Sequence, residues 1–238
     1  MPENHLTPEH ATISPAILYW GTPVVLVSTE NEDLSFNIAP ISSAWWLGNR
    51  CMLGLLSVSH TTKNLLRTKQ CVLNLPSDDM TDKVNALART TGSKEILTAT
   101  AIEPLYYFKK SNGYQYVKDK FSHANLTPVK SDIVRPARAM ECPVQMEGEL
   151  VGVHEMMQDV EGEVLFAMEI KVLRTHVHEN IRKSGTKNRI DTDKWRPMIM
   201  SFSELYGLKA KKADESELAE MEEEAYRGFS NPAEVDLM

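Results

Sequence analysis

Cysteine is scarce in this sequence, and the cysteines present indicate neither a disulfide framework nor a zinc site. Cys51, Cys71 and Cys142 are odd in number and widely spaced. No two of them are separated by the two residues that are typical of a zinc-binding pair. We expect each to be a buried, small apolar residue in a protein of a reducing compartment.

Long apolar runs are also missing, which argues against a membrane span. The richest stretch, Ala39 to Leu56, is interrupted by Asn49 and Arg50, whereas a spanning helix needs about 18 or more apolar residues in a row. Residues 1–10 lack a basic segment followed by an apolar one, so no secretory signal is expected. The sequence therefore predicts a cytoplasmic protein that does not bind membranes.

An excess of positive charge is absent as well. The 238 residues carry a net charge of −7, and no basic stripe occurs. Because contacts to phosphates dominate the affinity for nucleic acids, a nucleic-acid partner is not expected. A local site for one small anion remains compatible with this charge. The hydrophobic share of 42% and the charged share of 25% are ordinary for a globular protein with a real core.

Short apolar and β-branched runs predict a mainly β protein with a few helices. The strands are expected at residues 23–28, 36–40, 50–57, 70–75, 144–151 and 164–176. The first two are expected to form a hairpin, and 50–57 is apolar enough to be buried on both faces. Helices are expected at 61–68 and 79–91, the second ending at Gly92. Without regular alternation of strand and helix, a β-barrel is favoured over a Rossmann sheet.

Composition divides the chain into three parts. Residues 1–14 are expected to form a poorly fixed N-terminal arm, 15–208 the folded domain, and 209–238 an acidic, solvated tail. Within the domain, 93–135 is predicted to be an insertion of helix and irregular structure. Residues 180–197, rich in Lys and Arg, are predicted to be a surface loop.

Small hydroxyl residues follow two neighbouring strands, and the second run opens a helix. A helix N-terminus offers free N–H groups and a partial positive charge, which suit a phosphate. The hydroxyls of residues 57–62 add donors, and Lys63 or Arg67 would supply positive charge. Earlier in the chain, Pro40 ends a strand ladder. The backbone of residues 41–44 can then bind a flat heterocycle, against which Trp45 and Trp46 would pack.

The same residues fit a purely structural interpretation equally well. Hydroxyl side chains such as Ser59 and Thr61 commonly cap helices, and a tryptophan pair such as Trp45–Trp46 commonly lies in a core. Physical reasoning from the residues alone leaves both interpretations open.

Several segments taken together carry a resemblance to a known family. They are PVVLVS at 23–28, NIAPISS at 37–43, SVSHTTKNL at 57–65 and CVLNL at 71–75. This combination resembles the flavin reductase-like family, whose members have an FMN-binding split β-barrel. DKF at 119–121, LTP at 126–128 and ECPVQME at 141–147 resemble its flavoredoxin-like branch, which is related to the flavin reductase components of two-component monooxygenases. The resemblance covers residues 15–207.

The resemblance implies a homodimer in which FMN lies near the subunit interface. It implies that one segment lines the isoalloxazine ring, through Asn37, Ala39, Pro40, Ile41, Ser42 and Ser43, with Ala44 and Trp45 beside them. It implies that a second segment holds the phosphate, through Ser57, Ser59, Thr61 and Asn64, with His60 and Thr62 nearby. Many relatives have Lys or Arg at position 59 or 60, so Lys63 or Arg67 is expected to compensate. Relatives often have Gly at 125, where Asn tolerates a left-handed backbone.

The activity implied is that of an NAD(P)H-dependent flavin reductase. NADH or NADPH would pass hydride to flavin N5, and the electrons would go on to free flavin, oxygen, a partner oxygenase or a small organic acceptor. This chemistry belongs to the cofactor and needs no acid–base residue, so no catalytic residue is assigned. Two other functions stay open, a flavin-binding electron carrier without turnover and a split-barrel binding module that has lost flavin.

Two further signals are set aside. His176 and His178 share a strand face beside Glu179, but a metal would need a third ligand such as His154, and an exposed strand end is the simpler interpretation, so no metal site is expected. Thr91–Lys94 resembles a phosphate loop only superficially and is interpreted as a helix C-cap. No Gly-x-Gly-x-x-Gly occurs, so a nicotinamide cofactor would bind without the Rossmann device.

Overall fold

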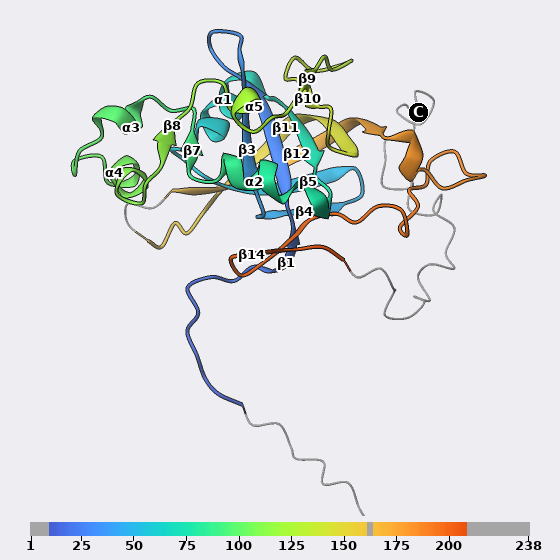
Figure 1. The fold of residues 1–238 in the computed structure, drawn as a ribbon. Helices are drawn as coiled ribbons and strands as arrows, with labels where there is room; N and C mark the ends of the chain where they lie inside the picture. The colour runs from blue at the N-terminus through green and yellow to red at the C-terminus, as the bar shows by residue number, and fades with distance from the viewer. Residues whose placement is uncertain (1–9, 161–163, 209–238) are drawn as a thin grey trace, which may run out of the picture.

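The computed structural model describes residues 10–160 and 164–208 (Figure 1). The predicted acidic tail at 209–238 and residues 1–9 of the predicted arm lie outside this part of the chain. Among the helices of the described residues, none has both the length and the apolar character needed to cross a membrane.

A seven-stranded antiparallel sheet forms the centre of the fold, with the strand order β3-β2-β6-β11-β12-β5-β4. Its strands are β2 (Val25–Glu30), β3 (Phe36–Ile41), β4 (Ala44–Leu47), β5 (Arg50–Leu56), β6 (Gln70–Leu75), β11 (Val144–Met156) and β12 (Leu165–Val177). The 13-residue strands β11 and β12 pair with each other, and each also pairs with one half of the sheet. The long hairpin therefore joins the β3-β2-β6 half to the β5-β4 half.

Shorter elements surround this sheet. The remaining strands are β1 (Trp20–Pro23), β7 (Thr90–Thr91), β8 (Gln115–Tyr116), β9 (Pro128–Val129), β10 (Arg138–Ala139), β13 (Ile199–Ser201) and β14 (Glu204–Tyr206). The helices are α1 (His60–Thr68), α2 (Thr81–Leu87), α3 (Glu95–Thr98), α4 (Pro104–Ser111) and α5 (Lys120–His123), with short 3₁₀ turns at Asp78–Met80 and Glu179–Ile181. Helices α1, α2 and α5 contact β3, whereas α3, α4 and β8 lie toward one side of the molecule (Figure 1).

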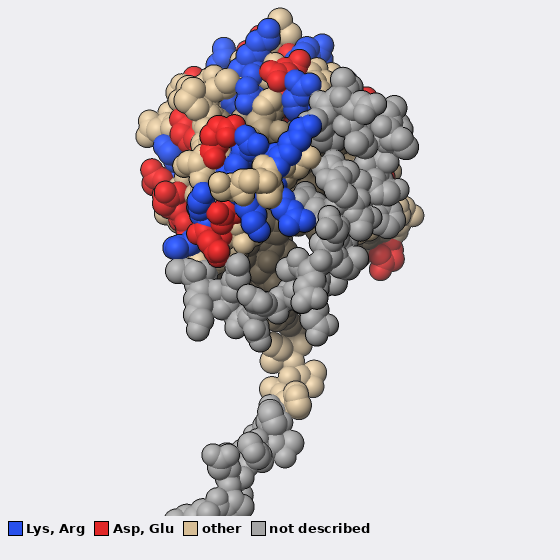
Figure 2. Space-filling view, turned by 90° about the vertical axis from the view of Figure 1, so that its right-hand side faces the viewer, with Lys and Arg blue, Asp and Glu red and all other residues tan. Residues whose placement is uncertain are grey.

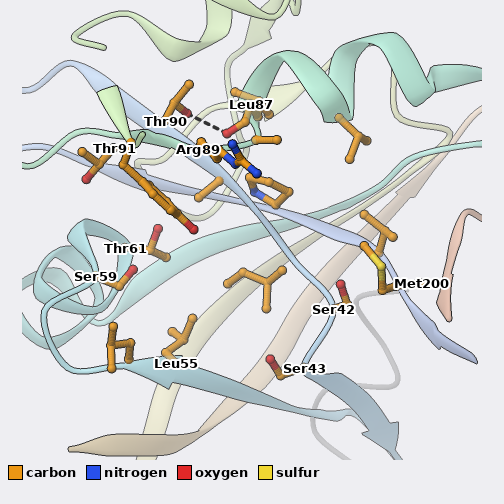
Figure 3. A pocket seen from close by; sticks show the side chains of 18 of the residues that line it. Ser42, Ser43, Leu55, Ser59, Thr61, Leu87, Arg89, Thr90, Thr91 and Met200 are labelled. Atoms are coloured by element: carbon orange, nitrogen blue, oxygen red, sulfur yellow. Dashed lines mark hydrogen bonds between the residues drawn. The ribbon is translucent and has the colours of Figure 1, made fainter. Parts of the chain in front are cut away.

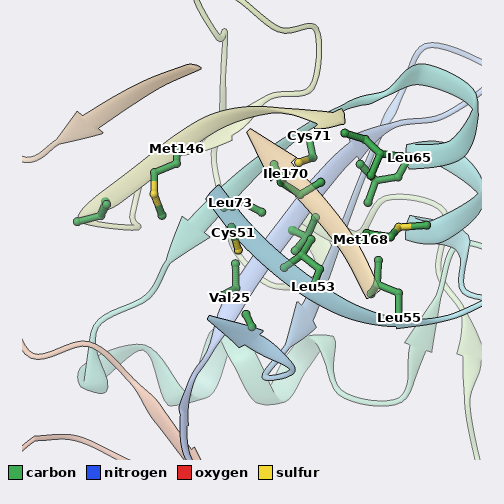
Figure 4. Close-up of a cluster of buried hydrophobic side chains, with 14 of the residues drawn as sticks. Val25, Cys51, Leu53, Leu55, Leu65, Cys71, Leu73, Met146, Met168 and Ile170 are labelled. Carbon is green, nitrogen blue, oxygen red and sulfur yellow. The ribbon is translucent and has the colours of Figure 1, made fainter. Parts of the chain in front are cut away.

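The core fills the space between the two halves of the sheet (Figure 4). Leu53, Leu73 and Ile170 are fully buried there, and each such side chain contributes about 1.5–3 kcal/mol to folding. Cys51 is also in this cluster, and burial raises the pKa of its thiol to about 12. All three cysteines are buried and free, as the sequence predicts.

The sequence predicts six of the seven strands of the central sheet, and it predicts helix α1 to within a few residues. The hairpin of β2 and β3 is confirmed, and so is the left-handed backbone of Asn125, with φ 51°. Strand β5 differs, because Cys51, Leu53 and Leu55 are buried while the residues between them are only half-buried. Its prediction as a strand buried on both faces is therefore wrong. β4 was not predicted, because two adjacent tryptophans carry no clear strand periodicity.

The helix predicted at residues 79–91 is too long. A 3₁₀ turn precedes α2, and α2 ends at Leu87, after which Ala88 is extended and Arg89 is left-handed with φ 52°. Thr90 and Thr91 then pair with β8 in a parallel bridge. Residues 91–94 are therefore not a helix C-cap. The helix ends at Leu87 because the residues that follow it pair, as β7, with the distant strand β8.

The basic segment at 180–197 lies on the surface, as predicted. Figure 1 shows it in orange on the right-hand side, and Figure 2 shows that side with basic and acidic side chains intermixed. Arg182 pairs with Glu179 at 2.8 Å and Lys194 with Asp191 at 3.6 Å. These local pairs partly neutralise the segment, so its lysines and arginines do not act as an isolated basic patch.

A buried carboxylate ties the 131–137 loop to the long hairpin. Glu147 on β11 is fully buried and accepts hydrogen bonds from the backbone N–H of Asp132 at 2.8 Å, of Ile133 at 2.6 Å and of Val134 at 2.9 Å. Its Oε1 also lies 2.7 Å from Nε2 of His176. Burial opposes the charge of Glu147, but these hydrogen bonds hold its pKa below the usual value.

This arrangement gives His176 a structural partner. One ligand atom each of Asp132, Glu147 and His176 lie within 4.8 Å of one another, but Asp132 is paired with Arg174 at 2.7 Å. His178 instead bonds the Met140 carbonyl at 2.9 Å. His176 on β12 pairs with Gln145 of β11, whereas His154 lies further along β11 and pairs with Ala167. At the usual rise per residue of a strand, the two histidines are about 30 Å apart. These contacts are those of a buried carboxylate, Glu147, that is satisfied by hydrogen bonds.

Replacing Glu147 by Gln is expected to lower the free energy of unfolding by about 3 kcal/mol, because the amide cannot accept all of these hydrogen bonds and its NH₂ group opposes a backbone donor. Glu147 has a lowered pKa in the folded state, so its contribution is present above the unfolded value of 4.5 and is lost as the pH falls through the folded value. Urea unfolding at pH 7 and at pH 3–4 measures both effects, and the gap between variant and wild type should narrow in acid. The exposed Glu149 on the same strand, replaced by Gln, is the matched control; equal losses in the two variants would contradict the assignment.

Candidate functional site

A cavity of about 630 Å³ lies between β3, the start of α1 and the segment from α2 to β7 (Figure 3). Its volume is within the range of small-molecule and cofactor sites. Further walls come from Tyr19, from the segment containing Met200 and Phe202, and from Lys109, Tyr114 and Lys120 of the insertion. Elements far apart in the sequence therefore share one concave site.

The first wall is the end of β3 and the turn that follows it. Ala39, Pro40 and Ile41 line the cavity, and so do Ser42 and Ser43. The turn is fixed by the hydrogen bond from the Gly54 N–H to the Ser43 carbonyl at 2.7 Å. A Cβ atom at residue 54 would lie 2.8 Å from the Ser43 Cβ, so glycine permits this close approach. The backbone of this turn therefore forms part of the cavity wall.

The second wall is the N-terminus of α1, where Ser59, His60 and Thr61 line the cavity. Ser59 occupies the N-cap position with an extended backbone, yet its side chain makes no capping hydrogen bond. Figure 3 shows Ser59 and Thr61 beside each other at the cavity. Because the first turn of a helix leaves N–H groups without helical partners, this end of the cavity is rich in donors.

Asn37 connects these two walls. Its Nδ2 donates to Thr61 Oγ1 at 3.2 Å and to Thr29 Oγ1 at 3.4 Å. Its Oδ1 is buried and has no hydrogen-bond partner among the described residues. A Cβ at Gly92 would lie 3.1 Å from this Oδ1 and 2.5 Å from Cδ2 of His60. An unsatisfied acceptor is thus buried in a residue that lines the cavity, beside a position that has no room for a side chain.

His60 is held neutral at the same end of the site. Its Nε2 lies 2.8 Å from Asn31 Oδ1, which also accepts from Asn64 Nδ2 at 2.9 Å. The Asn31 oxygen is therefore the acceptor, and His60 carries its proton on Nε2. Burial lowers the pKa of His60, and nearby cations such as Lys120 act in the same direction.

Three cations also line the cavity, and none of the described residues that line it is a carboxylate. They are Arg89, after α2, Lys109 on α4 and Lys120 on α5. Burial lowers the pKa of Lys109 and, more strongly, that of Lys120, which falls to about 7. An amine or guanidinium without a nearby carboxylate makes the local potential positive. This end of the molecule therefore suits an anion, although the whole chain is acidic.

The sequence had suggested Lys63 and Arg67 as the compensating charges, but they line a neighbouring pocket of about 450 Å³. Lys63 forms an ion pair with Glu95. Arg67 donates to the Glu30 carbonyl and to Asn64 Oδ1. His60 and Gly92 border both pockets.

The structure brings nine of the predicted site residues together around the main cavity. They are Asn37, Ala39, Pro40, Ile41, Ser42, Ser43, Ser59, His60 and Thr61. The other five lie elsewhere. Ala44 is in the core, Trp45 on β4 is 57% exposed, Thr62 donates to the Leu56 carbonyl, Asn64 lines the neighbouring pocket, and Ser57 lines neither pocket.

Arg89, Lys109 and Lys120 were missed by the sequence reasoning. Their positions depend on how the insertion folds back over β3, which no local pattern reveals. Asp119–Phe121 had been noted for its resemblance to flavoredoxin-like proteins, and it is the only available signal that pointed at one of them.

Comparisons with known proteins agree with this architecture. The family described as "Flavin reductase like domain" matches residues 19–208. A Bacillus subtilis (strain 168) protein, the uncharacterized protein YdfE, is 37% identical over 196 residues, which are 82% of this chain and 88% of that protein.

Two solved structures have the same fold at low sequence identity. Flavoredoxin of Desulfovibrio vulgaris (Miyazaki F) has a TM-score of 0.66 and 18% identity, and the match covers 90% of this chain and 100% of that one. Nitrilotriacetate monooxygenase component B from Bacillus cereus has a TM-score of 0.64 and 15% identity, covering 87% and 99%. The chain therefore belongs to the flavin reductase-like family and has its split-barrel fold.

Proposed function

We propose that this protein is a flavoprotein oxidoreductase that binds FMN in the main cavity and reduces it with NADH or NADPH. Membership of the flavin reductase-like family supports a flavin-related oxidoreductase. The observation that carries the proposal for FMN is the composition of the cavity wall. Donors at the start of α1 and three cations face a space without a carboxylate, and Asn37 adds an unsatisfied acceptor.

These residues fit a flat, phosphorylated ring system. Ser59, Thr61 and the first N–H groups of α1 would hold the phosphate. Arg89, Lys109 and Lys120 would offset its charge. A phosphate monoester carries close to two negative charges at neutral pH, so cations are needed that are not already paired.

The ring would lie against the end of β3. The backbone of Ile41 to Ser43 offers N–H and C=O groups at the cavity wall, and the Asn37 Oδ1 would accept a hydrogen bond from a ring N–H. FMN supplies the hydride-accepting chemistry when bound. The chain's own part is to orient the ring, to exclude water with apolar residues such as Leu55 and Met200, and to leave space for a nicotinamide.

We also propose a homodimer with the cavity near the interface. Large apolar side chains are exposed on the contacting strands β1 and β4 and at Phe202: Trp20 at 65%, Trp45 at 57%, Leu47 at 75% and Phe202 at 41%. The ring of Trp20 packs edge-on against that of Phe202 at 4.5 Å, and Phe202 itself lines the cavity. An exposed apolar group of this kind is typical of an interaction surface.

The acceptor of the electrons is proposed to be free flavin, oxygen or a partner oxygenase. The support for an oxygenase is the shared fold with a monooxygenase component B together with the sequence resemblance described above. Tests of the proposal start from the cofactor, because every acceptor depends on it.

Replacing Ser59 and Thr61 together by Ala is expected to raise the Kd for FMN by about tenfold or more, because hydrogen bonds to a charged phosphate are lost. The Kd for riboflavin, which lacks the phosphate, should change little. Quenching of flavin fluorescence measures both constants. Ser57→Ala is the matched control, since Ser57 belongs to the same segment but does not line the cavity. Equal losses for FMN and riboflavin would place the phosphate elsewhere.

Purified protein with added FMN is expected to oxidise NADH or NADPH at about 1 s⁻¹ or faster. The fall in nucleotide absorbance, followed with both nucleotides and a panel of acceptors, measures the rate. FMN binding without nucleotide oxidation would contradict the reductase and favour an electron carrier. A protein that takes up no flavin at all would instead be a binding module with this fold.

Leu47→Glu is expected to shift the protein from a dimer, with twice the 26.9 kDa mass of one chain, toward the monomer, because it places a charge in the proposed interface. Sedimentation velocity measures the mass. Leu97 on α3 is similarly exposed, at 60%, and Leu97→Glu is the matched control. A wild-type protein that sediments as a monomer at micromolar concentration would refute the homodimer.

A further inference from the structure

The amine of Lys120 is buried at the cavity without a partner. Lys120 is the first residue of α5, whose start is fixed by Asp119, which accepts a hydrogen bond from the Ser122 N–H at 3.0 Å. Helix α5 contacts β3, and the Lys120 side chain is only 1% exposed while lining the cavity. No described residue forms a hydrogen bond or an ion pair with this amine. A lysine so deeply buried is almost always paired.

The charged groups around Lys120 all have the same sign. Lys109 faces it from α4, and the neutral ring of His60 faces it from α1. Arg89 lines the same cavity. The cavity-lining residues of β3 and α2, which also contact α5, include no titratable group. The described residues that line the cavity therefore offer this amine no negative charge.

A structural lysine would have a different environment. Glu147, in the same molecule, is equally buried, and three backbone N–H groups and a histidine satisfy its carboxylate. A buried charge without partners costs free energy that folding alone does not recover. Lys120 therefore has the properties of a group that awaits a ligand.

We propose that Lys120 holds an oxygen of the bound flavin with its charged amine. This inference rests on the proposed function. The oxygen is either a carbonyl oxygen of the ring or an anionic oxygen of the phosphate, and both accept a charge-assisted hydrogen bond from an ammonium group. The unsatisfied Asn37 Oδ1 on the adjoining β3 would accept a hydrogen bond from the same ligand.

Binding would then be coupled to proton uptake. Without a ligand, burial and the repulsion from Lys109 lower the pKa of Lys120 to about 7. A flavin oxygen in contact with the amine favours its protonated form and raises that pKa. Below pH 7 the amine is already charged, so the affinity does not change with pH through this group. Above pH 7 the free protein must take up a proton to bind, so affinity falls as the pH rises.

The test is flavin affinity between pH 7 and pH 9, measured by fluorescence quenching with FMN and, separately, with riboflavin. For the wild type, the Kd for FMN is expected to rise by up to about tenfold per pH unit. Lys120→Met should bind about tenfold or more weakly at pH 7 and should show a flat pH profile. Lys120→Gln keeps a donor that does not titrate, so its profile should also be flat.

Lys83→Met is the control for simple loss of a positive charge, since Lys83 lines neither pocket and its amine bonds the Asn125 carbonyl. Its affinity and pH profile should match those of the wild type. Melting temperatures of the unliganded variants report folding, and Lys120→Met should melt no lower than wild type, because it removes a buried amine without partners.

The outcomes separate the two proposals. If the Lys120 variants lose affinity for both flavins, the amine holds a ring oxygen; if they lose affinity for FMN alone, it holds the phosphate. Lys120 variants that keep the wild-type pH profile would overturn this inference, whatever their affinity. A wild-type protein that binds neither FMN nor riboflavin would overturn the proposed function, and this inference would fall with it.

Discussion

The side-chain amide of Asn37 joins the elements that shape the cavity. It donates to Thr29 on β2 and to Thr61 on α1 while it stands on β3 itself. Through these bonds a buried strand is held against the start of a helix, and the Asn37 oxygen is left buried without a hydrogen-bond partner among the described residues. The donors of α1, the backbone after Pro40 and the close approach at Gly92 all depend on this junction.

The fold treats its buried polar groups in two ways. Glu147 is surrounded by donors and ties a loop to the long hairpin, so its charge is part of the folded structure. The Asn37 oxygen is buried without a hydrogen-bond partner among the described residues, and Lys120, which is 1% exposed, forms no hydrogen bond or ion pair with a described residue. Native proteins rarely leave such groups unsatisfied, and exceptions concentrate where a ligand binds. The positive potential of the cavity has the same origin, because its cations come without carboxylates on an otherwise acidic chain.

Local patterns were sufficient for six strands of the central sheet, for α1 and for two of the segments at the cavity. Apolar runs bounded by turn residues identify β2, β3 and β6, and hydroxyl residues before a leucine pair identify α1. Arg89, Lys109 and Lys120 could not be found this way. Arg89 reaches the cavity because the chain turns left-handed there, and the two lysines do so because β8 pairs with β7 and α5 packs on β3. Such long-range contacts decide the site's charge and leave no periodic signal in the sequence.

All of the proposals depend on one cavity that holds a flavin between β3 and α1. A crystal structure of the protein grown with excess FMN tests it most directly. We expect electron density for a flat ring beside Ile41 and for a phosphate at Ser59, with the Lys120 amine within hydrogen-bond distance of a flavin oxygen. Density for FMN at another place on the molecule, or a cavity filled by the protein's own side chains, would contradict it.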